Sequence, residues 1–105
     1  MVTRQFQAFR TPYPELAEGA PFLVVLQSDA FAKHSTVVVA PLVSEDHVGL
    51  LRTFRPRLEI EGRRYALNTL QVGTIPVADL GPPVAELDRY RIIESYDALI
   101  SGSAV

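Results

Sequence analysis

Apolar and polar residues alternate along several short segments of the chain, which predicts a protein built mainly of β-strands. The segment Gln5–Arg10 alternates loosely and fits a first strand. Phe22–Leu26 and Val37–Leu42 are continuously apolar and rich in β-branched residues, a pattern typical of strands covered on both faces. Turn-forming residues separate these segments, at Thr11-Pro12-Tyr13-Pro14, Glu18-Gly19-Ala20-Pro21 and Gly81-Pro82-Pro83.

The strongest local pattern predicts a β-hairpin. Four apolar residues (Phe54, Pro56, Leu58, Ile60) alternate with four charged ones (Arg55, Arg57, Glu59, Glu61). The pair Glu61–Gly62 fits a two-residue turn, in which glycine accepts a positive φ. This turn would place Leu58 opposite Tyr65 and Glu59 opposite Arg64, so that apolar and charged pairs both fall into register.

The end of the chain changes its period. Thr74–Asp79 fits a short strand, which Pro76 would place at a sheet edge or bulge. Apolar residues then recur at helical spacing, at positions Ile92, Ile93, Tyr96, Leu99 and Ile100. We expect Asp88 to cap this helix and Gly102 to end it. A short helix over Glu45–Leu51, capped by Ser44, is also possible.

Together these elements predict a mainly β fold in which a terminal helix packs against a small antiparallel, barrel-like sheet. The length of 105 residues accommodates one domain, residues 1–105. The chain contains no cysteine, which excludes disulfides and thiolate chemistry. Its net charge of −2 gives no general attraction to nucleic acid or an anionic membrane. Apolar runs are far shorter than the ~20 residues that span a bilayer, and no signal peptide is recognised, so we expect a cytoplasmic protein.

The basic residues are unevenly distributed. All of them except Lys33 are arginines, and five arginines cluster in the middle of the chain, at positions Arg52, Arg55, Arg57, Arg63 and Arg64. Arginine clusters can bind phosphate or carboxylate groups. Glu59 and Glu61 lie between these arginines, however, so we interpret the cluster as a solvated strand face.

Catalytic signatures are missing from the sequence. It contains no phosphate-binding glycine loop, zinc-binding His-Glu-x-x-His motif or Gly-x-Ser-x-Gly elbow. The trio Glu45-Asp46-His47 does not predict a metal site, because consecutive helical residues point about 100° apart. Arg57, Arg64 and Thr69 could serve a ribonuclease as cation, acid or base, but their spacing does not single them out.

Five motifs resemble those of the CcdB family in order and spacing. They are Gln5-Phe6, Leu26-Gln27-Ser28-Asp29, Val39-Ala40-Pro41-Leu42, Ile75-Pro76-Val77 and Val84-Ala85-Glu86-Leu87. Pro56 and Pro76 are also separated by the family's interval. The resemblance extends from Gln5 to the terminal helix.

This resemblance implies a CcdB/MazF-like fold, an SH3-like barrel of antiparallel strands with a C-terminal helix, assembled as a homodimer. Strands that are apolar on both faces suit a dimer, because a second protomer can bury one face. Members of the family are toxins of type II toxin–antitoxin pairs. They bind the A subunit of DNA gyrase and trap the gyrase–DNA cleavage complex without catalysing a reaction. A CcdA-like antitoxin neutralises them through a disordered segment that folds on binding. No cofactor, metal or direct nucleic-acid binding is implied.

The family's gyrase contacts lie directly after the Gln-Ser-Asp motif and at the end of the last helix. The matching residues after the motif are Ala30 and Phe31. With two residues deleted before the helix, Ile100, Ser101 and Gly102 match the helix end, and Asp97 would orient the contact. A gapless alignment instead places residues 103–105 at that end.

Neither alignment places a tryptophan where the family has one, and the chain contains none. Tryptophan is a frequent hot spot of interfaces, so the resemblance implies weak or species-restricted gyrase poisoning, supported mostly by Phe31 and Ile100. Two alternatives remain. One is a MazF-like endoribonuclease on the same barrel, although that family's N-terminal strand motif is not found here. The other is a non-toxic relative that only binds an antitoxin.

Overall fold

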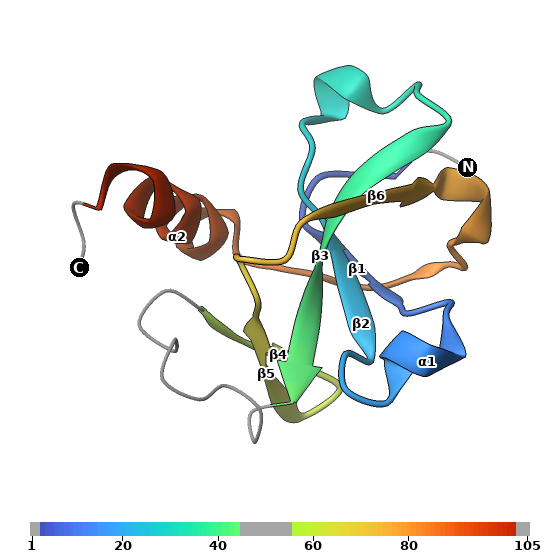
Figure 1. Cartoon of the computed structure of the whole chain (residues 1–105), viewed down its shortest axis with the longest axis horizontal. Helices are drawn as coiled ribbons and strands as arrows, with labels where there is room; N and C mark the ends of the chain where they lie inside the picture. Colours follow the sequence, from blue (N-terminus) through green and yellow to red (C-terminus); the bar gives the residue numbers. More distant parts are fainter. Residues whose placement is uncertain (1–2, 45–55, 103–105) are drawn as a thin grey trace.

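The computed structural model describes residues 3–44 and 56–102. In this part of the chain, seven strands form an antiparallel sheet and a helix follows them (Figure 1). The strands are β1 (Gln7–Arg10), β2 (Phe22–Val25), β3 (Thr36–Ser44), β4 (Arg57–Ile60), β5 (Arg63–Leu67), β6 (Gly73–Pro76) and β7 (Pro83–Glu86). The helical elements are α1 (Pro14–Ala17), α2 (Arg89–Ser101) and the 3-10 helices η1 (Asp29–Phe31) and η4 (Val77–Asp79). Among these helices, none is long and apolar enough to cross a membrane.

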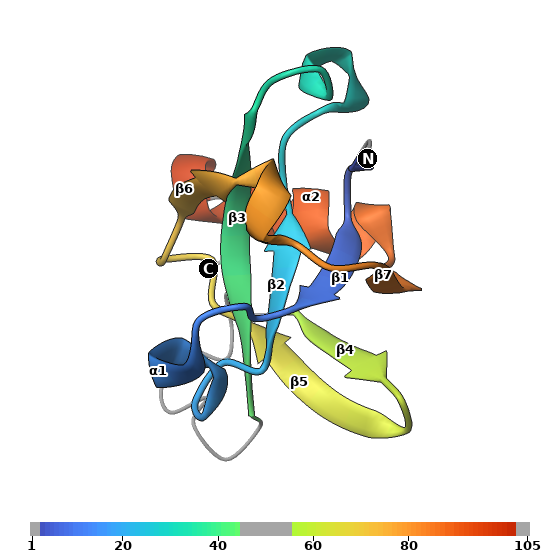
Figure 2. The ribbon, with the colours of Figure 1, turned by 90° about the vertical axis from the view of Figure 1, so that its right-hand side faces the viewer.

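The long strand β3 makes the sheet curl into a nearly closed barrel. On one side, the middle of β3 pairs with β2. β2 pairs in turn with β1, and β1 pairs with β7. On its other side β3 pairs with β6 through Thr36–Val39 and with β5 through Leu42–Ser44. Figure 2 shows β6 and the β4–β5 hairpin leaving β3 toward different ends of the molecule. The mainly β, barrel-like fold with a terminal helix predicted from the sequence is therefore confirmed.

Alternate residues of the central strands enter two separate cores. In β2, Phe22 and Val24 belong to the first core, whereas Leu23 and Val25 belong to the second. The first core is closed by residues of the hairpin and of α2, namely Leu58, Ile60, Leu67 and Ile92. The second is closed by the β6–η4 region, through Ile75, Val77 and Leu80. Every residue of β2 is consequently buried within one protomer.

This arrangement corrects one inference from the sequence. The apolar character of Phe22–Leu26 and Val37–Leu42 on both faces suggested a second protomer as the cover of one face. Instead, β6 and the residues after it fold back over the second face of β2 and β3. A homodimer therefore needs support from another surface.

The predicted hairpin is confirmed in its register. Leu58 pairs with Tyr65 and Glu59 with Arg64. Glu61 and Gly62 form the turn with φ values of 53° and 79°, and two successive positive φ values are the requirement of a type I′ turn.

Other boundaries differ from the prediction for local reasons. The first strand begins at Gln7 rather than Gln5, because Phe6 has a φ of 66°, outside the extended region. The strand predicted over Thr74–Asp79 ends at Pro76, and η4 follows it. Neither α1, which begins with a proline, nor β7 was predicted from the sequence. The possible helix over Glu45–Leu51 lies outside the described residues.

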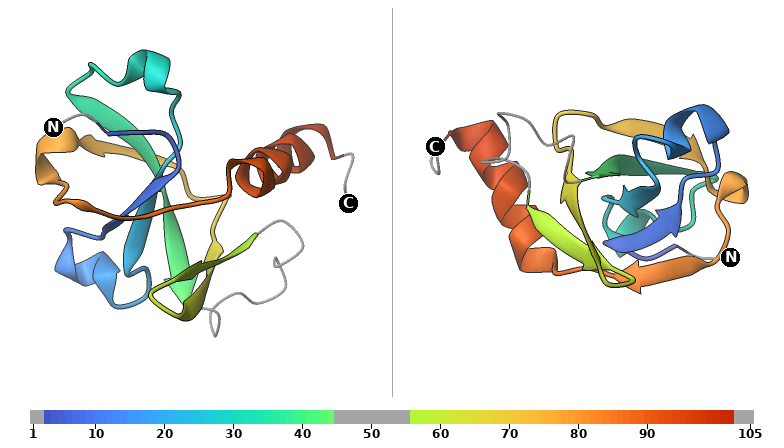
Figure 3. Two further views of the ribbon diagram at one scale, coloured as in Figure 1. Left: turned by 180° about the vertical axis from the view of Figure 1, so that it is seen from behind. Right: turned by 90° about the horizontal axis from the view of Figure 1, so that it is seen from below.

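The terminal helix has the predicted ends. Asp88 Oδ1 accepts hydrogen bonds from Tyr90 N at 3.0 Å and Arg91 N at 3.4 Å. Gly102 ends the helix with a φ of 71°, in the left-handed region that glycine tolerates. Figure 3 shows α2 projecting from one side of the barrel, with its last turn pointing away from the strands.

Candidate partner-binding surface

The loop between β2 and β3 is shaped by polar side chains at its start. Ser28 Oγ accepts a hydrogen bond from Ala30 N at 3.2 Å, which caps η1. Gln27 Nε2 donates to Phe31 O at 3.0 Å, and Gln27 Oε1 accepts from Val38 N at 3.1 Å. Gln27 thus links the end of η1 to β3, which holds η1 against the barrel.

Gln5 fixes η1 to the start of the barrel. Its backbone N donates to Asp29 Oδ1 at 2.7 Å, and its Nε2 donates to Leu26 O at 2.9 Å. Ala30 and Phe31, which are two of the predicted gyrase contacts, remain exposed on this anchored turn. The Phe31 side chain is 56% exposed, so it is available to a partner.

The other predicted contacts lie on the last turns of α2. Asp97, Ile100, Ser101 and Gly102 are all exposed, and Ile100 is the most exposed large apolar residue of the described chain at 84%. Ser101 Oγ donates to Asp97 O at 2.7 Å, and Gly102 N donates to Ala98 O at 2.8 Å. These bonds hold the helix end in a defined conformation.

One protomer does not gather all six predicted residues into one patch. Figure 1 shows η1 at the top of the barrel and the last turn of α2 at its left. A cavity of about 380 Å³ lies between α2 and the strands, and only Asp97 of the six residues lines it. Its lining consists of Gln5, Phe6, Leu26, Val72, Ile92, Ile93, Tyr96 and Asp97.

The outward face of α2 carries an apolar stripe, although its helical spacing had suggested a single face turned to the core. Ile92 is fully buried and Tyr96 packs partly against the first core. Tyr90 and Ile100 are 77% and 84% exposed, and Ile93, which also lines the cavity beneath α2, is 38% exposed. One residue along a helix is a rotation of about 100°, so Ile92 and Ile93 cannot share one narrow contact with the barrel. The apolar positions of the sequence span an arc too wide for one contact with the barrel, and this width could have indicated the second stripe. Tyr90 was not identified from the sequence.

Tyr96 carries the one buried side-chain oxygen without a hydrogen-bond partner among the described residues. Burial raises the pKa of the Tyr96 phenol to about 12, because the charged phenolate is poorly solvated beneath α2. The tyrosine therefore remains neutral over the physiological pH range.

The residues considered for ribonuclease chemistry differ in their exposure. Arg64 is exposed, Arg57 is half-buried, and Thr69 is only 1% exposed. A buried threonine cannot reach a phosphate that the exposed Arg64 could bind. Of the arginine cluster, Arg52 and Arg55 lie outside the described residues, as does the Glu45-Asp46-His47 trio.

Comparison with known proteins agrees with the fold. A solved structure titled "Endoribonuclease in complex with its cognate antitoxin from Mycobacterial species" matches with a TM-score of 0.67. The match covers 95% of this chain and 91% of that one at 17% sequence identity, so it establishes a shared fold. A search of curated proteins gives no match.

The strands and the terminal helix define a small β-barrel domain with a C-terminal helix. The family model described as "CcdB protein" matches residues 5–102, nearly the whole chain. The protein belongs to the CcdB family. This membership confirms the resemblance seen in the sequence and supports a role in a toxin–antitoxin pair.

Proposed function

We propose that this protein is the toxin of a type II toxin–antitoxin system, which binds the A subunit of DNA gyrase and is neutralised by a CcdA-like antitoxin. The observation that carries the proposal is the family match over residues 5–102. Two features of the surface agree with it. The positions that correspond to gyrase contacts in the family, Phe31 and Ile100, hold exposed apolar side chains, 56% and 84% accessible.

The proposed action is binding rather than catalysis. Phe31 would insert into an apolar site on gyrase from an anchored turn, at low entropic cost, because Gln27 and Asp29 already hold that turn. Ile100 would supply the second contact, with Asp97 orienting it and Ser101 and Gly102 allowing close approach. Since gyrase is a cytoplasmic enzyme, this function places the protein in the cytoplasm.

A homodimer completes this proposal. The supporting surface is formed by Tyr90 and the exposed part of Ile93 on α2, which one protomer leaves uncovered within its described residues. An isologous contact through these two side chains would bury them on both protomers and leave Ile100, at the helix end, accessible to gyrase.

The second candidate function is an endoribonuclease. It is favoured by the fold shared with the endoribonuclease described above. The burial of Thr69 argues against the catalytic set considered from the sequence.

Purified protein should be tested with gyrase and supercoiled plasmid, and separately with RNA. Accumulation of gyrase-dependent linear DNA, weakened by Phe31→Ala and by Ile100→Ala, is the expected result. Lys33→Gln, on the loop after η1, is a matched surface control. RNA cleavage without gyrase-dependent DNA cleavage would assign the endoribonuclease function, and neither activity would leave a non-toxic relative that binds an antitoxin.

A further inference from the structure

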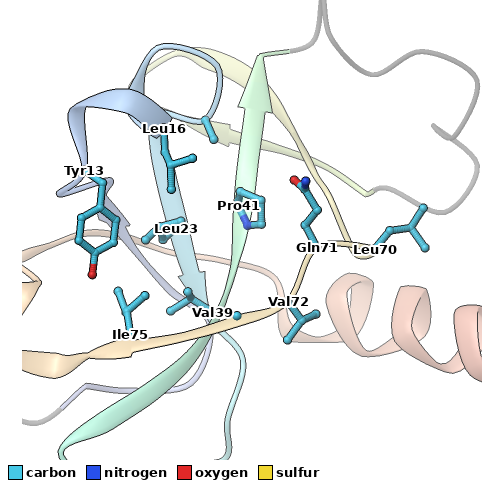
Figure 4. A pocket seen from close by; sticks show the side chains of 11 residues that line it. Tyr13, Leu16, Leu23, Val39, Pro41, Leu70, Gln71, Val72 and Ile75 are labelled. Carbon is cyan, nitrogen blue, oxygen red and sulfur yellow. The ribbon is translucent and has the colours of Figure 1, made fainter.

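A second hollow lies on the opposite side of the central strands from the first core. It has a volume of about 380 Å³, and Figure 4 shows the side chains that line it, which come from three parts of the chain. Leu23 of β2, Val39 of β3 and Ile75 of β6 form its apolar floor. The remaining lining residues are Tyr13, Leu16, Ala20, Pro41, Leu70, Gln71, Val72 and Gly73. We call this hollow the α1 groove.

The rim of the α1 groove is apolar and exposed. Leu16 on α1 is 54% exposed, and Leu70 and Val72 on the opposite rim are 50% and 52% exposed. Side chains of this kind beside an apolar floor are typical of interaction sites. Gln71 and Tyr13 are the polar side chains of the lining, and no charged residue among those the structure describes belongs to it.

The charged residues of the two outer segments that line the groove are all acidic. The segments that bound it, residues 13–20 and 68–79, contain Glu15, Glu18 and Asp79 and no lysine, arginine or histidine. Asp79 is held at the groove by Tyr13, whose Oη donates to Asp79 Oδ2 at 2.6 Å. Glu15 and Glu18 are exposed on either side of Leu16 along the chain.

We propose that the α1 groove binds a short segment of a partner protein that carries apolar anchor residues flanked by lysine or arginine. The apolar anchors match the floor and the rim leucines, and the basic flanks match the three carboxylates. If two copies of this chain associated through their α1 grooves, their acidic rims would face each other. Like-charge repulsion disfavours such a dimer.

This surface differs from the η1 and α2 residues proposed to contact gyrase. Val72 is the residue common to the α1 groove and to the cavity beneath α2. Leu16 lines the α1 groove and not that cavity, so the Leu16→Ser variant tests the inference independently of gyrase poisoning.

The test uses short random peptides displayed on phage, selected on the full-length protein and depleted on Leu16→Ser. Synthetic copies of the enriched peptides are then titrated against the protein by fluorescence anisotropy. The expected peptides combine at least one large apolar residue with lysine or arginine near it. Their affinity should fall about tenfold with Leu16→Ser or Val72→Ser, as the loss of an anchor contact implies.

Charge is tested separately with the double variant Glu15→Gln/Glu18→Gln. Added salt should weaken binding to the wild-type protein, and the double variant should bind more weakly and with less salt dependence. Glu86→Gln/Glu94→Gln removes the same charge from β7 and α2 and should leave peptide affinity unchanged.

Several outcomes would overturn the proposal. They are the absence of peptides that distinguish wild type from Leu16→Ser, enrichment of acidic or uncharged sequences, and equal effects of the two double variants. If Leu16→Ser instead changes the sedimentation of the protein alone, the groove is an interface between copies of this chain. Circular dichroism establishes that each variant retains its fold.

Discussion

Arg10 and Glu61 join two distant parts of the barrel. Arg10 Nη2 donates to Glu61 Oε1 at 2.8 Å, which links the end of β1 to the turn of the β4–β5 hairpin. The Arg10 guanidinium also lies 5.5 Å from the centre of the Phe22 ring, and Phe22 contacts Tyr65 of the hairpin edge-on with ring centres 5.1 Å apart. The hairpin is therefore held over the first core by both charge and aromatic packing.

Because both charged side chains are more than half exposed, the ion pair should contribute little. We expect Glu61→Gln to lower the free energy of unfolding by about 0.2–1 kcal/mol, and less in high salt. Arg10→Ala should cost more, because it also removes the cation–π contact, which is worth about 0.5–1 kcal/mol at exposed sites. Urea unfolding at low and high salt measures both effects. Equal losses for the two variants would show that the Phe22 contact contributes nothing.

The same turn offers a stabilising substitution. Glu61 has a φ of 53°, a conformation that asparagine tolerates better than glutamate or glutamine. Asn-Gly is a preferred sequence of type I′ turns. Relative to Glu61→Gln, which loses the same ion pair, Glu61→Asn should be more stable by up to about 1 kcal/mol. Urea unfolding of both variants checks this, and lower stability of the asparagine variant would contradict the turn assignment.

The hairpin could be predicted because its information is local. The period of two fixed which residues face the core, and Glu61–Gly62 fixed the turn, so the register followed without knowledge of other strands. The Gln27-Ser28-Asp29 motif likewise contains the residues that shape η1, whereas the role of Ala30 and Phe31 in gyrase binding stays a prediction.

Other features depended on contacts between distant segments. The sequence could not reveal that residues 73–80 would cover the second face of β2, because both a partner protomer and a later strand satisfy the same apolar pattern. Helical spacing placed Ile93 and Ile100 on one helix face with Ile92, because spacing alone does not show which part of an apolar arc meets the barrel. The short α1 was missed because a four-residue helix has too few positions to display a period.

The second core should stabilise a single protomer. Phe9 is 1% exposed and belongs to that core, so Phe9→Ala should lower the free energy of unfolding by about 3–5 kcal/mol. Phe9→Leu should cost less and keep the protein folded. Analytical ultracentrifugation of Phe9→Leu should match wild type. A change of oligomeric state in this variant would mean that the second face of β2 forms part of an interface between protomers after all.

Removal of the Tyr96 hydroxyl should stabilise the protein. A buried hydroxyl without a partner costs about 1–3 kcal/mol, and Tyr96→Phe removes this cost while keeping the ring against the core. The expected gain is up to about 1 kcal/mol, since the ring is only partly buried. Thermal unfolding at neutral pH measures it, and a loss of stability would show that the hydroxyl has a partner.

The same residue predicts a pH dependence. Since the pKa of Tyr96 is raised to about 12 from 10.0, the folded state favours the neutral phenol. The stability that the folded state gains by keeping this phenol protonated is fully present below pH 10. It is lost as the pH rises through about 12 and the phenol ionises. We expect Tyr96→Phe to reduce the loss of stability in this interval. An unchanged alkaline transition would assign it to other groups.

The end of α2 should determine how strongly gyrase is poisoned. Ser101 is exposed, and its hydroxyl bonds back to Asp97 O within the helix, so a larger side chain can extend into solvent from this position. Tryptophan contributes about 150–250 Å² of contact area where it is buried at an interface, far more than serine offers. We therefore expect Ser101→Trp to strengthen trapping of the gyrase–DNA complex and to lower the half-maximal toxin concentration at least about tenfold, as for a hot-spot contact.

Plasmid cleavage titrated with toxin measures the change in potency. Glu94→Trp, earlier on the same helix, controls for the addition of an exposed aromatic residue. Combination with Phe31→Ala should reduce the gain, because the turn and the helix end would contact the same target. Equal potency of Ser101→Trp and wild type, with the fold unchanged by circular dichroism, would remove the helix end from the proposed gyrase contact.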